Sequence, residues 1–253
     1  MMFMLIDAHI HLDQYQENEI PALLEKAEYV IAVSMNLASC EKTWMLSKTY
    51  KNVKAAFGFH PEQALPSKME MDALFDWIRQ HAHEMIAIGE VGLPYYLKQE
   101  KNIDYRPYTA LLESFILLAK EIDKPIILHA VYEDAALACD LLERHQVTKV
   151  HFHWFKGDEI VVERMIQNGY FISVTPDCTY EEEIQQLITK YPIELIMVET
   201  DGPWPFEGPF DNKRTSPWMM NHSVEVIASI KGLSTQEAAK IITQNTKSFY
   251  NLY

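Results

Sequence analysis

Two histidines stand one residue apart where the first apolar run of the chain ends. The segment LIDAHIHLDQY (5–15) contains His9 and His11. Residues two apart in a strand point to the same side, so both rings can reach one ion. Neutral imidazole is a good ligand for zinc, manganese, iron or nickel. The spacing therefore indicates half of a metal site.

More acids and imidazoles stand at the ends of other apolar runs. They are His60, Glu90, His129, His151, His153, Glu199 and Asp201. One histidine in an apolar run is usually a hydrogen-bonded core residue, but a whole set would leave several buried polar groups unpaired without a cation. Glu90 could bridge two ions with its two carboxylate oxygens. The other histidines fall in helical or loop segments and are predicted to face solvent; they are His81, His83, His145 and His222.

These residues must be positioned by eight short apolar runs. The runs cover 3–10, 29–35, 53–60, 85–92, 124–130, 148–155, 170–176 and 194–202. Each is too short for a helix, and nearly continuous hydrophobicity favours strands buried on both faces. Segments with apolar residues at three- and four-residue spacing predict helices. These segments are 19–29, 71–85, 108–122, 133–146, 158–170 and 233–250.

Strand and helix alternating eight times over 253 residues predicts an α/β protein with a (β/α)8 TIM barrel. An open doubly wound sheet is the alternative, but the sequence has no Gly-rich phosphate fingerprint. In a barrel the chemistry lies at the carboxyl ends of the strands, where the acids and imidazoles fall. One domain over residues 1–253 is the simplest organisation.

Composition limits the partners. The formal net charge of −14 opposes non-specific binding to nucleic acid or anionic membranes. A polyanionic substrate would need bound metal or a few Lys and Arg side chains. Three separated cysteines form no CxxC pair and are predicted as buried apolar residues. The start MMFML is too short for a signal peptide, and no apolar run approaches the ~18 residues of a membrane span, so we expect a cytoplasmic protein.

The motifs taken in order resemble a known family. HxH at 9–11, GFHP, GEVGL, IILHA, HWFKG and ETDGP are similar to the pattern of the TatD-type metal-dependent deoxyribonucleases, a branch of the amidohydrolase-like barrels. The segment NTKSFYNL (245–252) resembles the closing helix of that family. The resemblance covers nearly the whole chain and implies a hydrolase with two divalent ions, which could be Zn, Mn or Mg.

The resemblance also implies roles for single residues. His9 and His11 would bind one ion, shared with Asp201 and with Glu90 as the bridging ligand. His129 would bind the second ion.

HWFKG resembles the H-x-F-x-G motif of the family, which makes His153 rather than His151 the other ligand of the second ion. His151 is left to the core or to a supporting role. His60 resembles a residue that positions the scissile phosphate.

Three positions depart from the family pattern. Pro94 replaces the acid of GLDY, Ala130 and Val131 replace a serine and an arginine after His129, and Thr215 replaces an asparagine. These positions belong to substrate recognition rather than to the ligand set. The substrate is therefore less well defined than the hydrolytic chemistry.

The predicted reaction is phosphodiester hydrolysis by a metal-activated water. Asp201 would accept or relay the proton beside the bridging Glu90, and His60, Lys156 and Arg214 are candidates to hold phosphate oxygens. The substrate would be a DNA end or another phosphodiester.

Two other interpretations remain open. A metal-dependent amidohydrolase or lactonase acting on a small molecule would use the same ligands. In that case the loop 203–218, rich in proline and aromatic residues, would roof the pocket and select the substrate. The other interpretation is a barrel that binds metal or a partner without catalysis.

Overall fold

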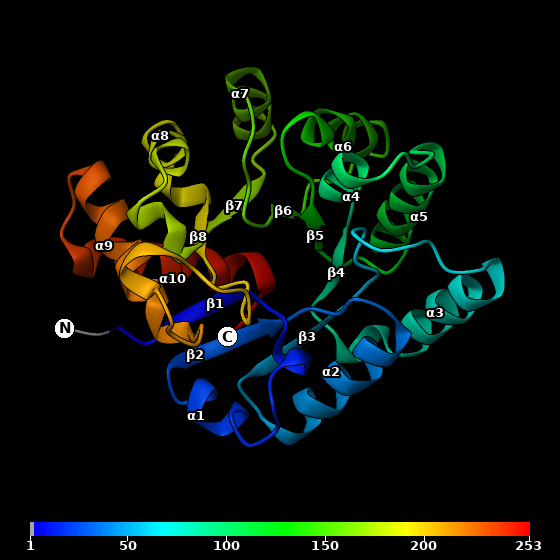
Figure 1. The fold of residues 1–253 in the computed structure, drawn as a ribbon, viewed down its shortest axis with the longest axis horizontal. Coiled ribbons are helices and arrows are strands. Elements are labelled where there is room, and N and C mark those ends of the chain that lie inside the picture. Colours follow the sequence, from blue (N-terminus) through cyan, green and yellow to red (C-terminus); the bar gives the residue numbers. More distant parts are fainter. Residues whose placement is uncertain (1–2) are drawn as a thin grey trace.

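Eight parallel strands form one sheet in the computed structural model, which describes residues 3–253 (Figure 1). Each strand pairs with the next along the chain, so the spatial order is β1 to β8. A doubly wound sheet reverses its strand order near the middle, and this one does not. The barrel prediction is confirmed. The strands are β1 Leu5–Ile10, β2 Ala27–Ala32, β3 Val53–Phe57, β4 Ala87–Gly92, β5 Ile126–His129, β6 Val150–Phe152, β7 Phe171–Val174 and β8 Ile196–Val198.

The first and last strands meet just beyond their carboxyl ends. The backbone N–H of Asp201 donates to the carbonyl of His9 at 2.9 Å, and the N–H of His11 donates to the carbonyl of Gly202 at 2.8 Å. These two hydrogen bonds join the edges of the sheet. The seam of the barrel therefore runs through residues of the predicted metal site.

Helices surround the strands (Figure 1). They are α1 Ile20–Leu24, α2 Leu37–Thr49, α3 Lys68–Gln80, α4 Tyr95–Glu100, α5 Arg106–Glu121, α6 Glu133–Arg144, α7 Glu159–Gln167, α8 Glu182–Lys190, α9 Met220–Lys231 and α10 Thr235–Tyr250, with short 3-10 turns between some of them. Five predicted helices are confirmed within a few residues. Helix α10 begins at a capping box, in which the Ser234 and Glu237 side chains bond each other's backbone N–H groups. No helix within residues 3–253 is long and apolar enough to cross a membrane.

The prediction of a helix over 19–29 is wrong beyond Leu24. Helix α1 is one short turn, and the chain enters β2 at Ala27. Tyr29 and Val30 pair with Ile6 and Asp7 of β1. Pairing with the first strand overrides the helical spacing of this segment, since strand propensity depends strongly on the surrounding sheet.

One layer of apolar side chains lies on each side of the sheet. The large outer core packs strands against the surrounding helices. A smaller inner core fills the barrel and contains Ile6, Ala8, Ile31, Val33, Ala56, Ala87, Ile127, Met197, Tyr250 and Leu252. Helix α10 (red in Figure 1) ends at Tyr250. The side chains of Tyr250 and Leu252 from this C-terminal segment belong to the inner core. The three cysteines are buried and free, as predicted.

Bulges in β1 and β4 change which side chains point inward. From Asp7 to Ile10 strand β1 advances three residues while its partner advances two, and β4 does the same between Ile88 and Val91. Because of the extra residue, Ile88 and Val91 both join the outer core. Glu90 is thereby turned to the barrel interior. An unbroken alternation would have placed it with Ile88, facing the helices.

Candidate metal centre

Six predicted ligands converge at the carboxyl ends of the strands. They are His9, His11, Glu90, His129, His153 and Asp201, and all are buried. Glu90 lies at the middle of the cluster, and its side chain is inaccessible to solvent. His129 and Glu199 follow the inner-core residues Ile127 and Met197 by two positions, so strand alternation turns them to the same interior.

The two oxygens of Glu90 face different imidazoles. Its Oε2 lies 3.2 Å from His9 Nε2 and 3.1 Å from His11 Nε2. Its Oε1 lies 3.0 Å from His129 Nδ1 and 2.7 Å from His153 Nε2. The donors therefore divide into two groups that share one carboxylate.

Asp201 belongs to the first of these groups. Its Oδ1 lies 3.3 Å from His9 Nε2 and 3.4 Å from His11 Nε2. The side chain is 11% exposed, whereas Glu90 is fully enclosed. Asp201 has φ 49°, in the left-handed region, and Tyr132 and Trp154 at the ends of β5 and β6 have positive φ as well. Such backbone conformations concentrate at functional sites.

The electrostatics of the cluster favour a bound positive charge. Although burial favours the neutral ring, the nearby carboxylates of Asp201 and Glu90 raise the pKa of His11 to about 10. Despite burial, the surrounding rings of His60, His153 and His9 hold the pKa of Glu90 well below its usual range. The carboxylates that hold protons on these rings would equally hold a cation in their place.

Several polar atoms of the cluster lack hydrogen-bond partners among residues 3–253. They are His9 Nδ1 and Nε2, His11 Nδ1, both oxygens of Glu90 and Asp201 Oδ1. The contacts of 3.1 to 3.4 Å around Glu90 Oε2 and Asp201 are close enough for attraction. They do not have hydrogen-bond geometry. Leaving a buried polar atom unpaired costs about 1–3 kcal/mol. Nitrogen and carboxylate donors placed in this way fit divalent cations.

His60 faces the cluster with a donor rather than a lone pair. Its Nδ1 accepts the backbone N–H of Glu62 at 3.1 Å, so the proton of the neutral ring is on Nε2. That N–H points at Glu90 Oε1, 3.4 Å away. Burial lowers the pKa of His60 to about 4, so the ring is neutral near pH 7. This arrangement suits a hydrogen bond to an anionic group better than metal ligation.

Glu62 is a site residue that was not predicted from the sequence. Its Oε1 lies 3.1 Å from His129 Nε2, on the side of the ring opposite Glu90. The carboxylate also accepts the backbone N–H groups of Tyr96 and Leu97 in α4. Helix α4 begins after Pro94, the residue that stands where the family has an acid. The only sequence signal for Glu62 was that it is an acid two positions after His60.

Glu199 and His151 lie below the ligands inside the barrel. Glu199 Oε1 is 3.3 Å from His153 Nδ1, and Ser173 bonds the other oxygen of Glu199. His151 lies between Ser173 and Tyr250, and burial holds its pKa well below the usual range. His151 therefore lies in the core beneath the predicted ligands, as expected from the sequence.

Asp7 is a further buried acid that was not predicted as part of the site. It accepts hydrogen bonds from the backbone and the hydroxyl of Thr200, at 3.0 and 2.6 Å. These bonds tie β1 to the turn that carries Asp201.

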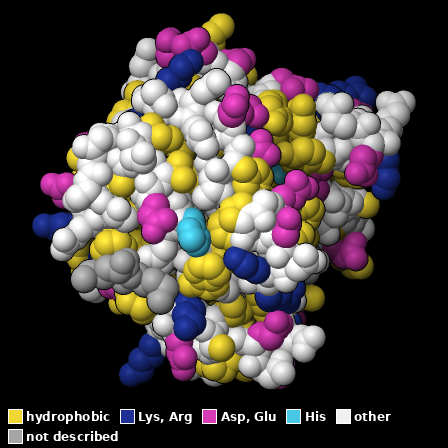
Figure 2. Space-filling model, turned by 60° about the vertical axis from the view of Figure 1, so that its left-hand side comes forward, with side chains coloured by type: hydrophobic (Ala, Val, Ile, Leu, Met, Phe, Trp, Pro, Cys, Tyr) yellow, Lys and Arg dark blue, Asp and Glu magenta, His cyan; other side chains and the backbone are white. Residues whose placement is uncertain are grey.

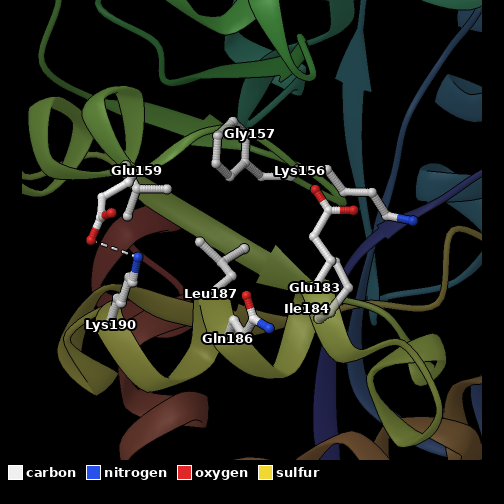
Figure 3. Close-up of a pocket in the computed structure, with 10 residues that line it drawn as sticks. Lys156, Gly157, Glu159, Glu183, Ile184, Gln186, Leu187 and Lys190 are labelled. Atoms are coloured by element: carbon white, nitrogen blue, oxygen red, sulfur yellow. Dashed lines mark hydrogen bonds and ion pairs between the residues drawn. The ribbon is translucent and has the colours of Figure 1, made fainter.

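Lys156 and Arg214 form no hydrogen bond or ion pair with the six predicted ligands among the described residues. Arg214 is half exposed, pairs with Glu19 at 3.2 Å and lies over the ring of Tyr15. Lys156 lies 3.9 Å from Asp177 and lines a pocket of about 210 Å³ beside α7 and α8 (Figure 3). A Glu159–Lys190 ion pair of 2.7 Å lies at the edge of that pocket. None of its lining residues belongs to the metal cluster, so the two sites are separate.

The loop 203–218 packs beside the cluster rather than hanging free. Phe206 and Phe210 are buried with Met219, and Phe206 lies 5.8 Å from the ring of Trp154, the residue after His153. Trp204 is 60% exposed and 6.4 Å from the same ring. The loop thus places an exposed aromatic side chain near the end of β6.

The histidines outside the cluster differ in exposure. His83 faces solvent, as predicted. The other three, His81, His145 and His222, are half buried. His81 stacks on Trp77 with ring centroids 4.0 Å apart, and His145 bonds Glu113 at 2.7 Å. The prediction that these three face solvent is therefore only partly right.

Comparison with known proteins agrees with this geometry. The family model described as TatD related DNase matches residues 6–251. An uncharacterized metal-dependent hydrolase of Haemophilus influenzae is 42% identical over 253 residues, which cover 98% of this chain and 100% of that protein. Human deoxyribonuclease TATDN3 is 30% identical over 264 residues, with 97% and 94% covered.

The crystal structure of the TatD homolog YJJV from Escherichia coli has the same fold. Its TM-score is 0.86 at 24% identity, with 100% of each chain covered. A TatD family hydrolase of Entamoeba histolytica superposes with a TM-score of 0.84 at 20% identity, covering 99% of each chain. Family model, relatives and fold agree over nearly the whole chain. The chain belongs to the TatD-related DNase family.

Proposed function

We propose that this chain hydrolyses phosphodiester bonds at the ends of DNA, using two divalent cations. As a member of its family the chain is a metal-dependent hydrolase. The number of ions and the substrate are the parts that the proposal adds. The observation that supports it best is the division of donors around Glu90, whose two oxygens face separate pairs of imidazoles.

The ligand sets follow from this division. His9, His11 and Asp201 would hold one cation with Glu90 Oε2, and His129 and His153 would hold the other with Glu90 Oε1. When bound, such cations lower the pKa of a water and neutralise phosphate oxygens.

Asp201 and His60 have positions that suit them to the reaction. Asp201 is the partly exposed carboxylate of the cluster, so it can take a proton from a water entering from solvent. The Nε2–H of His60 can donate to a phosphate oxygen and orient it. The backbone N–H of Glu62, which bonds Nδ1, keeps this proton on Nε2 in the neutral ring.

The distribution of surface charge indicates that affinity for a phosphate substrate comes from the site rather than from the protein surface as a whole. Lys and Arg side chains are dispersed over the face in Figure 2 and form no continuous basic patch there. With a net charge of −14, phosphate attraction has to come from the site itself. Lys156 and Arg214 remain candidates for contacts further along a strand, and the exposed Trp204 for contact with a base.

The test is a substrate screen on chelator-stripped protein. Mg²⁺, Mn²⁺ and Zn²⁺ are added back separately, with bis(p-nitrophenyl) phosphate and end-labelled oligonucleotides set against amide and lactone panels. We expect metal-dependent loss of end nucleotides, and no turnover by Glu90→Gln. Glu121→Gln, an exposed acid paired with Arg79, is the matched control and should keep full activity.

Other outcomes would overturn the proposal. Turnover confined to amides or lactones would support a small-molecule hydrolase instead. Metal binding without turnover on any panel would support a non-catalytic barrel. Full activity in Glu90→Gln would remove the bridging carboxylate from the mechanism.

A further inference from the structure

A line of buried hydrogen bonds runs through the barrel interior from the C-terminal helix to the metal cluster. Tyr250 Oη lies 2.7 Å from His151 Nδ1, and His151 Nε2 lies 2.5 Å from Ser173 Oγ. Ser173 bonds Glu199, whose other oxygen lies 3.3 Å from His153 Nδ1. All five residues are buried, in a region where a barrel is normally filled by apolar side chains.

The direction of each hydrogen bond follows from the acceptor at one end. The carboxylate of Glu199 can only accept, so Ser173 Oγ–H and His153 Nδ1–H both donate to it. Since the hydroxyl proton of Ser173 is committed, its oxygen accepts from His151 Nε2–H. A buried imidazolium would need a carboxylate partner. The nearest carboxylate to His151 is Glu199, 4.0 Å away. His151 is therefore neutral, and its Nδ1 accepts the hydroxyl proton of Tyr250.

We propose that this line of hydrogen bonds, from Tyr250 through His151 and Ser173 to Glu199, fixes the Nδ1–H tautomer of His153 and leaves its Nε2 free for a cation. Nε2 is the atom that lies 2.7 Å from Glu90 Oε1. A histidine that donates its other N–H to a carboxylate is held in orientation and made a better ligand. Tyr250, His151 and Ser173 are thus positioning residues, and the inference rests on the proposed metal site.

The test uses variants that remove one hydroxyl each. Ser173→Ala breaks the line next to Glu199, and Tyr250→Phe removes only its far end. The matched control is Tyr191→Phe, which removes another buried hydroxyl, bonded at 2.6 Å to the carbonyl of Tyr170 and outside the line. All three variants lose a buried hydrogen bond, so they share the general loss of stability.

Two measurements separate positioning from stability. Nitrogen-15 NMR of the Zn²⁺-loaded protein reports which ring nitrogen of His153 carries the proton, because without metal Nε2 also holds a proton toward Glu90 Oε1, 2.7 Å away. Titration calorimetry with Zn²⁺ alone reports affinity. We expect pure Nδ1–H in the wild type and in Tyr191→Phe. Ser173→Ala should give mixed tautomers and Zn²⁺ binding weakened about 10-fold or more, in the range seen for such supporting residues. Tyr250→Phe should change the tautomer ratio and the Zn²⁺ affinity in the same direction as Ser173→Ala, but to a smaller extent.

The possible results are distinct. A wild-type tautomer and wild-type affinity in a folded Ser173→Ala protein would overturn the inference. If that variant does not fold, Tyr250→Phe decides in the same way. If Ser173→Ala changes the tautomer and the Zn²⁺ affinity but Tyr250→Phe changes neither, Tyr250 and helix α10 do not contribute to positioning His153. If the wild type binds no divalent cation, the proposed function fails, while NMR of the metal-free protein still tests whether His153 Nδ1 carries a proton that is hydrogen-bonded to Glu199.

Discussion

Replacing Gly92 with alanine should damage the centre through the backbone. A Cβ at Gly92 would lie 1.9 Å from the carbonyl oxygen of His129, where about 3.5 Å is an ordinary separation. Strands β4 and β5 would have to part by more than about 1 Å, and the 2.9 Å hydrogen bond from Leu93 N–H to His129 would be lost. Overpacking of this kind costs about 1–3 kcal/mol and the hydrogen bond about 1 kcal/mol more. For a chain of this size the melting temperature should fall by roughly 5–15 °C.

The displacement should also separate His129 from Glu90, so Zn²⁺ affinity should fall beyond what instability explains. Gly169→Ala is the control. Gly169 has φ 68°, and an added Cβ there would meet no atom within 4 Å among the described residues beyond its two chain neighbours. Alanine therefore costs about 1–2 kcal/mol from conformation alone. Scanning calorimetry and Zn²⁺ titration on both variants test this. Normal Zn²⁺ affinity in Gly92→Ala would refute the link between strand contact and ligand placement.

Three further predictions concern single side chains. Glu62→Gln removes the charge facing His129 Nε2, so Zn²⁺ affinity measured by calorimetry should weaken about 10- to 100-fold, with Glu121→Gln unchanged. His60→Phe should lower kcat on bis(p-nitrophenyl) phosphate by about 10²- to 10³-fold, and unaltered kcat would exclude the proposed donor. Arg164 and Asn168 lower the pKa of Glu143 to about 2, so this carboxylate stabilises the fold above its ordinary pKa and the gain is lost as the pH falls toward 2. The melting temperature of Arg164→Met should lie about 2 °C below wild type at pH 7, and equal differences at pH 7 and pH 2.5 would contradict this assignment.

The barrel could be predicted because its strands are buried on both faces. Such strands appear in the sequence as short apolar runs, and each of the eight runs overlaps a strand. The predicted ligands could be recognised because each polar residue interrupts one of these runs at its end. His9 and His11 show this most clearly, because the chain repeats the imidazole at strand spacing.

Other parts of the site left no such mark. Glu62 follows a loop histidine, and its importance depends on how α4 packs against it. Ser173 and Tyr250 are ordinary residues of a strand and a helix, and only the folded barrel brings them to His151. The segment 19–29 has helical spacing, yet pairing with β1 decides the conformation of its second half.

The bulges in β1 and β4 make the centre depend on residue count as well as residue type. Across the bulge in β4, Val91 lies opposite Leu128 of β5. If β4 continued from Ile88 without the bulge and with its residues unchanged, Glu90 would lie opposite Leu128 and face the helices, while Val91 would face the imidazoles. The acid therefore reaches the centre through a slip of one residue between two neighbouring strands, and regular pairing of the same residues would leave the centre without its middle carboxylate.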